Sequence, residues 1–295
     1  MRHFGLKIRM AVVGALLAGF YLVAVAAAMV VFGEGILPIA IVGSILLIGI
    51  QYKVGKWAAL RSVGAENLPE TQYSQIHQFV EQVCQKKDLK KPSLKIADMG
   101  VPNAFAVGRR GDGTVVISRE LIQLLDRDEL EGVIAHELAH IDNRDVITMQ
   151  LGQGIASIVA IVAQYMVLLT GENDLADFFL AVVIGNIVQF IVMLFVLAIS
   201  RYREYVADSD AKAVIGQGEP LARALEKIHQ ENQQVQHSTQ RTQRDRSQTQ
   251  QNRRRDANVD QQVSALCISS PDRGFLQKIV STHPPMEQRI KQLRS

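Results

Sequence analysis

Three residues within one short stretch of the sequence, VIAHELAHIDNRD (residues 133–145), could together bind a metal ion and use it: His136, Glu137 and His140. On a helix, positions 136 and 140 lie one turn apart on the same face, so both imidazoles can reach a single zinc ion. The glutamate between them can take a proton from a metal-activated water. The spacing therefore predicts a catalytic zinc helix. A solvated helix face that carries two histidines is the alternative, and a third ligand has to decide.

The sequence offers that third ligand in the stretch SRYREYVADSDA, residues 200–211. Catalytic zinc needs three protein ligands and one open position, and Glu204 can be the third. Asp208, four positions later on a predicted helix, can accept the N–H of a ligand histidine. The alternative for Glu204 is a surface carboxylate that pairs with Arg201 or Arg203.

Apolar stretches without Asp, Glu, Lys or Arg predict four transmembrane helices in two hairpins. Each stretch has about 17–25 residues, which suffices to cross roughly 30 Å of hydrocarbon. The second pair contains glutamines and an asparagine, so helices buried within protein remain an alternative there. The predicted spans are residues 10–33, 35–52, 146–170 and 178–200.

The charges that flank these hairpins predict their orientation. Lysines and arginines lie at both ends of each hairpin, whereas the connecting segments 32–35 and 171–177 carry only acidic charges. The polar parts of the chain are therefore expected on the cytoplasmic side of a cytoplasmic (inner or plasma) membrane. Because an even number of crossings separates His140 from Glu204, both emerge on the same face. An antiparallel helix pair then brings them close together.

The predicted fold class is an α-helical membrane protein with an α+β cytoplasmic zinc-metallopeptidase domain. A segment rich in glutamine and arginine, residues 230–262, is too polar to offset its ordering entropy and is expected to be a disordered loop. The predicted parts are a first hairpin (1–56), a first peptidase segment (57–145), a second hairpin (146–200) and a second peptidase segment (201–295).

Local signals predict the elements that carry the motif. A helix should begin at about Arg127, with Asp126 as its N-cap and Glu129 completing a capping box. Another helix is expected over residues 71–88. Short strands are expected at residues 94–97, 104–107 and 114–118, with a hairpin turn at Gly111-Asp112-Gly113 between the last two.

Two bulk properties narrow the class of protein. Cys84 and Cys267 lie far apart on the reducing side and match no metal or redox spacing, so they are expected to be ordinary thiols. The net charge of +3 is explained by the basic membrane flanks and gives no argument for a nucleic-acid partner.

Several motifs together resemble one family, the HtpX-type membrane zinc metalloproteases, which are related to the CaaX-prenyl proteases. They are KWAALRSVGAE, NAFAVG, VIAHELAHIDNRD, REYVAD and THPPMEQRI, in the order and approximate spacing of that family. The resemblance implies one Zn²⁺ per chain, held by His136, His140 and Glu204, with Glu137 as general base. It also implies that the substrates are damaged or misfolded membrane proteins or unfolded proteins. The Gln/Arg-rich segment is longer and more polar than the family would lead us to expect.

The resemblance also suggests residues that contact the substrate. An oxyanion needs a further donor, for which His283 is the first choice, followed by Arg289 and Tyr205. A capping or core role is the alternative for His283. An edge strand above the zinc is expected to pair with an extended substrate, although a purely structural strand is the alternative. That strand comprises Asn103, Ala104, Phe105 and Ala106.

Two other functions compete with this one. An intramembrane protease would place the motif inside a span, but the charged residues around it make that position costly. A membrane scaffold or transporter with a structural zinc would need a fourth protein ligand, and no Cys or His near the motif offers one. The partners expected for a protease are its substrates, the lipid bilayer and other membrane quality-control proteases.

Overall fold

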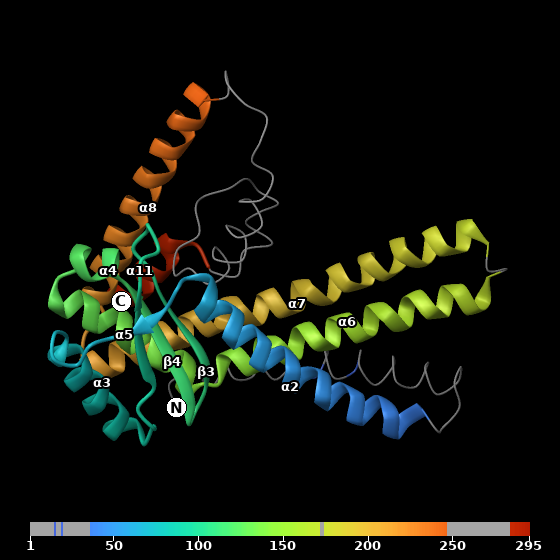
Figure 1. Cartoon of the computed structure of the whole chain (residues 1–295), viewed down its shortest axis with the longest axis horizontal. Coiled ribbons are helices and arrows are strands. Elements are labelled where there is room, and N and C mark those ends of the chain that lie inside the picture. Colours follow the sequence, from blue (N-terminus) through green and yellow to red (C-terminus); the bar gives the residue numbers. More distant parts are fainter. Residues whose placement is uncertain (1–14, 16–18, 20–35, 172–173, 247–283) are drawn as a thin grey trace. The chain divides into compact units, whose positions relative to one another are not determined.

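A computed structural model of the chain describes residues 15, 19, 36–171, 174–246 and 284–295 (Figure 1). The chain divides into two compact units, Met1–Val54 with Ile147–Tyr202, and Gly55–Val146 with Arg203–Ser295. The predicted boundaries at 56, 145 and 200 differ from these by one or two residues. The described part is mostly helical and contains one small sheet.

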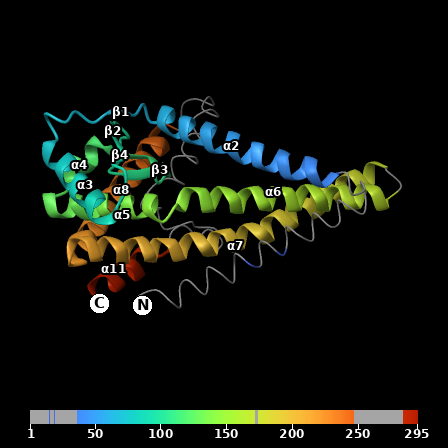
Figure 2. The same cartoon turned by 90° about the horizontal axis from the view of Figure 1, so that it is seen from below.

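The first unit is built around two long apolar helices, α6 (Asp145–Thr170) and α7 (Leu175–Ile215), which run side by side (Figure 2). Ala156 and Val159 of α6 pack against Val192 and Val196 of α7. By length and composition, the stretches Leu151–Thr170 and Leu175–Ile215 could each cross a membrane. α7 is continuous, so the fourth predicted span and the helix that carries Glu204 are one element.

The first predicted hairpin is covered only in part. Helix α2 (Ile36–Ser62) includes residues 36–52 of the second predicted span and continues well beyond it. The first predicted span, residues 10–33, lies outside the described residues except for two positions. α2 ends in a Schellman motif, in which the amide of Gly64 (φ +60°) donates to Arg61 O and that of Ala65 donates to Leu60 O.

The second unit contains a four-stranded sheet in the order β1-β2-β4-β3. β2 and β4 are parallel, whereas β3 and β4 form an antiparallel hairpin with Arg109 opposite Asp112. The turn is therefore Arg110-Gly111, and the prediction of Gly111-Asp112-Gly113 is wrong because Asp112 and Gly113 already belong to β4. The strands are β1 (Glu66–Asn67), β2 (Ser93–Ala97), β3 (Ala104–Arg109) and β4 (Asp112–Ser118).

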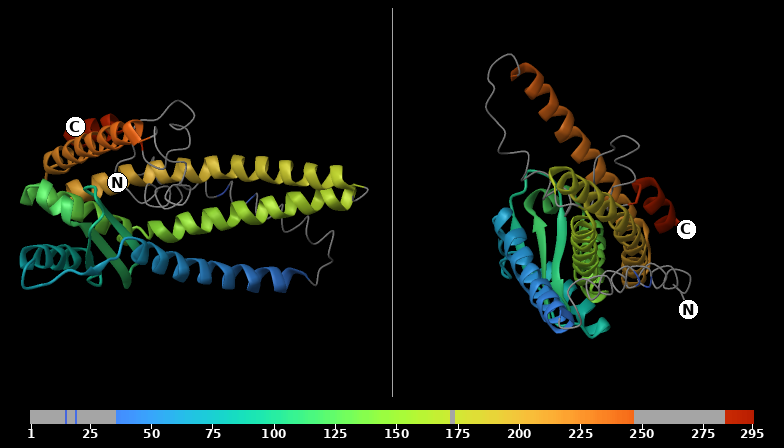
Figure 3. Two further views of the ribbon diagram at one scale, coloured as in Figure 1. Left: turned by 45° about the horizontal axis from the view of Figure 1, so that its top comes forward. Right: turned by 90° about the vertical axis from the view of Figure 1, so that its right-hand side faces the viewer.

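Helices cover both faces of this sheet. One face contributes Leu94, Val115 and Ile117 to the main core, which several helices complete. The last turns of α2 lie along the other face, as Figure 3 shows, where Leu60 packs near Phe105. The helices around the main core are α3 (Ser74–Lys87), α4 (Arg119–Leu124), α5 (Arg127–Asp142), α8 (Glu219–Arg246) and α11 (Met286–Arg294).

Helix α5 is held at its start by the predicted capping box. The carboxylate of Glu129 accepts the backbone N–H of Asp126 at 3.0 Å. Glu129 is also buried against α8, where Arg223 and Lys227 donate to its two oxygens at 3.2 and 2.7 Å. This local signal and a long-range ion-pair cluster together place the beginning of the metal-motif helix.

Helix α8 corrects one prediction. Residues 230–246 were expected to belong to a disordered loop, but they continue α8 to Arg246. Glutamine, glutamate and arginine are good helix formers, so a polar segment can propagate a helix that begins on an apolar core. Residues 247–262, the rest of that predicted loop, lie outside the described residues.

Candidate metal centre

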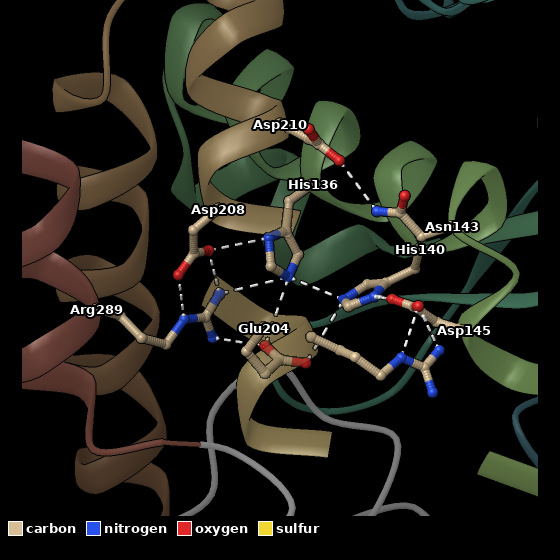
Figure 4. A network of polar contacts seen from close by, with 9 residues as sticks. His136, His140, Asn143, Asp145, Glu204, Asp208, Asp210 and Arg289 are labelled. Atoms are coloured by element: carbon tan, nitrogen blue, oxygen red, sulfur yellow. Dashed lines mark hydrogen bonds and ion pairs between the residues drawn. The ribbon is translucent and has the colours of Figure 1, made fainter. Parts of the chain in front are cut away.

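Two helices bring the predicted metal ligands together. α5 presents His136 and His140 one turn apart, and α7 presents Glu204 opposite them (Figure 4). The Glu204 carboxylate oxygens lie 3.6 Å from His136 Nε2 and 3.5 Å from His140 Nε2. One atom of each of these three side chains lies within 4.8 Å of the other two, which is close enough for one metal ion.

The outer nitrogens of both rings face carboxylates. His140 Nδ1 lies 2.6 Å from Asp145 Oδ2, and His136 Nδ1 lies 3.0 Å from Asp208 Oδ1. A carboxylate can only accept there, which favours a proton on each Nδ1, and a ring that is otherwise neutral then directs the lone pair of its Nε2 inward. These two Nε2 atoms are 3.1 Å apart and face the Glu204 carboxylate. Such a set of electron-pair donors fits a bound cation.

Charge and burial set the protonation of this set when no metal is bound. Burial alone would lower the pKa of His136, but its contacts with Asp208 and Glu204 raise that pKa to about 9. Burial and the nearby charge of His136 lower the pKa of His140 to about 4. A proton on His136 can therefore bridge the two Nε2 atoms at the position where a cation would bind.

Arg289 of α11 supplies a positive charge behind the carboxylates. It is fully buried, and its guanidinium donates to the two Asp208 oxygens at 2.8 and 2.7 Å. It also lies 3.1 Å from Glu204 Oε2 and 3.3 Å from His136 Nε2. Burial opposes its charge, but Asp208 and Glu204 keep the pKa of Arg289 above its usual range. Arg289, predicted as a reserve oxyanion donor, is thus bound to the carboxylates around the metal ligands.

Asp145 and Arg203 also belong to the site, although the sequence did not predict them there. Arg203, which is 3% exposed, donates through Nε to Asp145 Oδ1 at 2.6 Å, while the other Asp145 oxygen faces His140. Glu204 is only 5% exposed, so the surface-carboxylate alternative for it is wrong. The available signal was an acidic residue five positions after His140, where α5 gives way to α6.

Glu137 is buried beside the candidate metal site, with 3% of its surface exposed. Burial raises the pKa of Glu137, against the lowering effect of His140 and His136. A carboxylate with a raised pKa is better matched to accepting and returning a proton near neutral pH.

The remaining predicted site residues lie on other elements or outside the described chain. The hydroxyl of Tyr205 donates to Gln288 Oε1 at 2.9 Å and links α7 to α11. Asn103 is buried, and its backbone N–H donates to Ser118 Oγ at 3.0 Å. Residues 104–106 begin β3, which is the last strand of the sheet and packs against α5. His283 lies outside the described residues.

Comparison with known proteins identifies the family. The sequence pattern of peptidase family M48 matches residues 70–295, which include every residue of the candidate site. The chain belongs to peptidase family M48. A protease HtpX homolog of Halobacterium salinarum is 66% identical over 289 residues, which are 97% of this chain and 100% of the relative. A protease HtpX homolog of Aquifex aeolicus is 34% identical over 247 residues, or 79% and 75% of the two chains.

The fold of this M48 peptidase is also found in a solved structure. The crystal structure of S. mikatae Ste24p superposes with a TM-score of 0.54 at 14% identity, over 98% of this chain and 66% of that one. The match to peptidase family M48 and the similarity to protease HtpX homologs confirm the resemblance to HtpX-type proteases, and this M48 peptidase is a membrane metalloprotease. The scaffold or transporter alternative is not favoured.

Proposed function

We propose that this chain is a zinc-dependent endopeptidase that cleaves damaged or misfolded membrane proteins at the cytoplasmic face of the membrane. The observation that carries the proposal is the convergence of His136 Nε2, His140 Nε2 and the Glu204 carboxylate, with both outer ring nitrogens facing carboxylates. Zinc held by these three side chains would supply Lewis-acid polarisation of a peptide carbonyl and of water. One Zn²⁺ per chain is expected.

The protein groups supply the proton transfers and the positioning. The carboxylate of Glu137 takes a proton from the attacking water as its oxygen bonds to the scissile carbonyl carbon. Glu137 then returns that proton to the amide nitrogen as the C–N bond breaks. An extended substrate would pair with β3 at residues 104–106, close to α5, along the edge where no other strand of the described residues pairs with it. We propose His283 as the residue that donates a hydrogen bond to the oxyanion, with Arg289 and Tyr205 as the alternatives.

The membrane arrangement is part of the proposal. Four spans in two hairpins, with both polar segments in the cytoplasm, would place the site a few residues from the bilayer. The two apolar helices α6 and α7 and the charge distribution of the sequence support this arrangement. The expected partners are membrane-protein or unfolded substrates, the lipid bilayer and other quality-control proteases, but not nucleic acid.

The function can be tested with metal-free protein purified in detergent with a chelator. We expect that stoichiometric zinc starts cleavage of an unfolded protein substrate, and that excess chelator stops it. Zinc bound at one equivalent without cleavage of any unfolded or membrane-protein substrate would instead support a structural metal. In that case the metal should also resist exchange, because a fourth protein ligand would close the site.

Replacing Asp145 with asparagine should weaken zinc binding by about 10- to 100-fold, because His140 loses the carboxylate that orients its ring. Competition with a chromophoric chelator measures this affinity. Asp142→Asn is a matched control, since Asp142 pairs with Lys87 and Arg110 near the same helix end. Equal zinc affinity in Asp145→Asn and wild type would show that this contact does not support the metal.

Zinc affinity should also depend on pH through His136. Below its pKa of about 9 the ring is protonated, so zinc must displace a proton. We expect the affinity to rise about tenfold per unit from about pH 7 and to level off above the pKa. Chelator competition at each pH, corrected for the protonation of the chelator, measures the slope. A flat profile would contradict proton displacement from this ring.

A further inference from the structure

The last turns of α2 have two different faces. One face packs on the sheet through Ala59 and Leu60, and Lys56 on this side donates to the Asp112 carboxylate at 2.7 Å. Trp57, by contrast, is 62% exposed. The sheet therefore sets the rotation of α2 and leaves the tryptophan pointing away from the protein.

Two cations flank this tryptophan on the same exposed face. Lys53 and Arg61 lie four residues before and after Trp57, which places all three side chains in one row. The Arg61 guanidinium carbon lies 5.7 Å from the centre of the Trp57 ring. Among the described residues, Lys56 has a carboxylate partner, whereas no ion pair is found for Lys53 or Arg61.

The row continues toward the start of α2 as exposed apolar side chains. Every fourth residue before the tryptophan region is large, apolar and at least half exposed: Val42, Leu46, Ile50 and Val54. An exposed apolar stripe of this length is unfavourable in water. Along α2 the stripe is followed by an indole and then by a guanidinium, which is the sequence of groups found where a helix leaves a bilayer.

We propose that Lys53, Trp57 and Arg61 form a binding site for the headgroup of an anionic phospholipid at the bilayer surface. This proposal rests on the proposed function, in which the chain spans a membrane. The indole would lie at the level of the headgroups, with its N–H available to a lipid oxygen, and the two cations would bind the phosphate. Because Leu60 and Ala59 on the opposite face of the same turns hold the sheet, a bound lipid would fix the sheet, with its edge strand β3, relative to the membrane surface.

The sequence provides a built-in probe, since Trp57 is its only tryptophan. Metal-free full-length protein would be reconstituted into phosphatidylcholine vesicles that contain either brominated phosphatidylglycerol or brominated phosphatidylcholine at equal fractions. Bromine quenches only nearby indoles, so the two quenching curves give the relative affinity of the site for the two headgroups. We expect a preference of about tenfold for the anionic lipid, given two basic residues at the surface.

The double variant Lys53→Gln/Arg61→Gln should bind the two lipids about equally, because both cations of the site are removed. Lys86→Gln/Lys90→Gln removes the same charge from exposed positions at the end of α3 and just beyond it and should keep the preference. Equal quenching by both lipids in wild type would overturn the proposal. A preference that survives in Lys53→Gln/Arg61→Gln would also overturn the proposal. The electrostatic field of the protein's other charges, rather than these two side chains, would then explain the preference.

Zinc-dependent cleavage, measured on the same vesicles after zinc is added, separates this proposal from the proposed function. Cleavage without a lipid preference would overturn only the lipid site. A lipid preference that follows Lys53 and Arg61, without any cleavage, would support the lipid site and overturn the protease proposal. Protein that floats with the vesicles but shows no quenching by either lipid would overturn the lipid site.

Discussion

Glu204→Gln should lose more than 100-fold in zinc affinity and nearly all proteolytic activity. Removing a direct ligand must cost more than the 10- to 100-fold expected for an outer-shell partner. The amide that replaces the carboxylate is a neutral and weaker ligand. It also leaves Arg289 with one fewer carboxylate partner in a fully buried site. Equilibrium competition with a chelator and a cleavage assay at saturating zinc measure the two losses separately.

Asp210→Asn is the matched control for this variant. It removes a carboxylate from the same helix, where Asp210 accepts from Asn143 at 3.0 Å rather than facing the histidines. We expect its zinc affinity and activity to stay near wild type. A thermal unfolding curve of metal-free Glu204→Gln would establish that the variant is folded. Wild-type zinc affinity in folded Glu204→Gln would exclude Glu204 as a ligand.

Glu137→Gln should slow cleavage by about 100- to 10,000-fold while zinc affinity stays within a few-fold of wild type, because the amide cannot accept the proton of the attacking water. The side chain keeps its size, and none of the contacts that orient His136 or His140 is removed. The loss should therefore appear in kcat/KM at saturating zinc, with metal binding measured on the same sample.

Glu131→Gln on the same helix tests whether the effect is specific. Glu131 pairs with Arg127 near the start of α5 at 2.9 Å, and such a surface pair contributes little to stability. We expect this variant to cleave at the wild-type rate. Substantial activity in Glu137→Gln would mean that another group accepts the proton, and the assignment of the general base would have to change.

The three metal ligands could be predicted from the sequence because their positions depend on the period of a helix and on the number of predicted membrane crossings. A spacing of four residues places His136 and His140 on one helix face wherever that helix lies. An even number of predicted crossings brings Glu204 to the same side of the membrane as the histidines. The structure brings one atom of each of these side chains within 4.8 Å of the others.

The contacts that hold those ligands could not be predicted, because they join residues whose proximity depends on packing. Asp145 and Arg203 are 58 positions apart, and Arg289 and Asp208 are 81 apart. Each of these charged side chains has many possible partners in the sequence. Burial selects among them, since a charge removed from water must find an opposite charge within reach.

Local propensity also competes with composition in ways that only the structure decides. The polarity of residues 230–246 predicted disorder, yet they continue a helix whose start packs on the core. The sequence shows Lys53, Lys56 and Arg61 as three similar basic residues at the end of a span. The sheet decides which of them points inward, because Leu60 must pack on it, and only Lys56 then reaches Asp112.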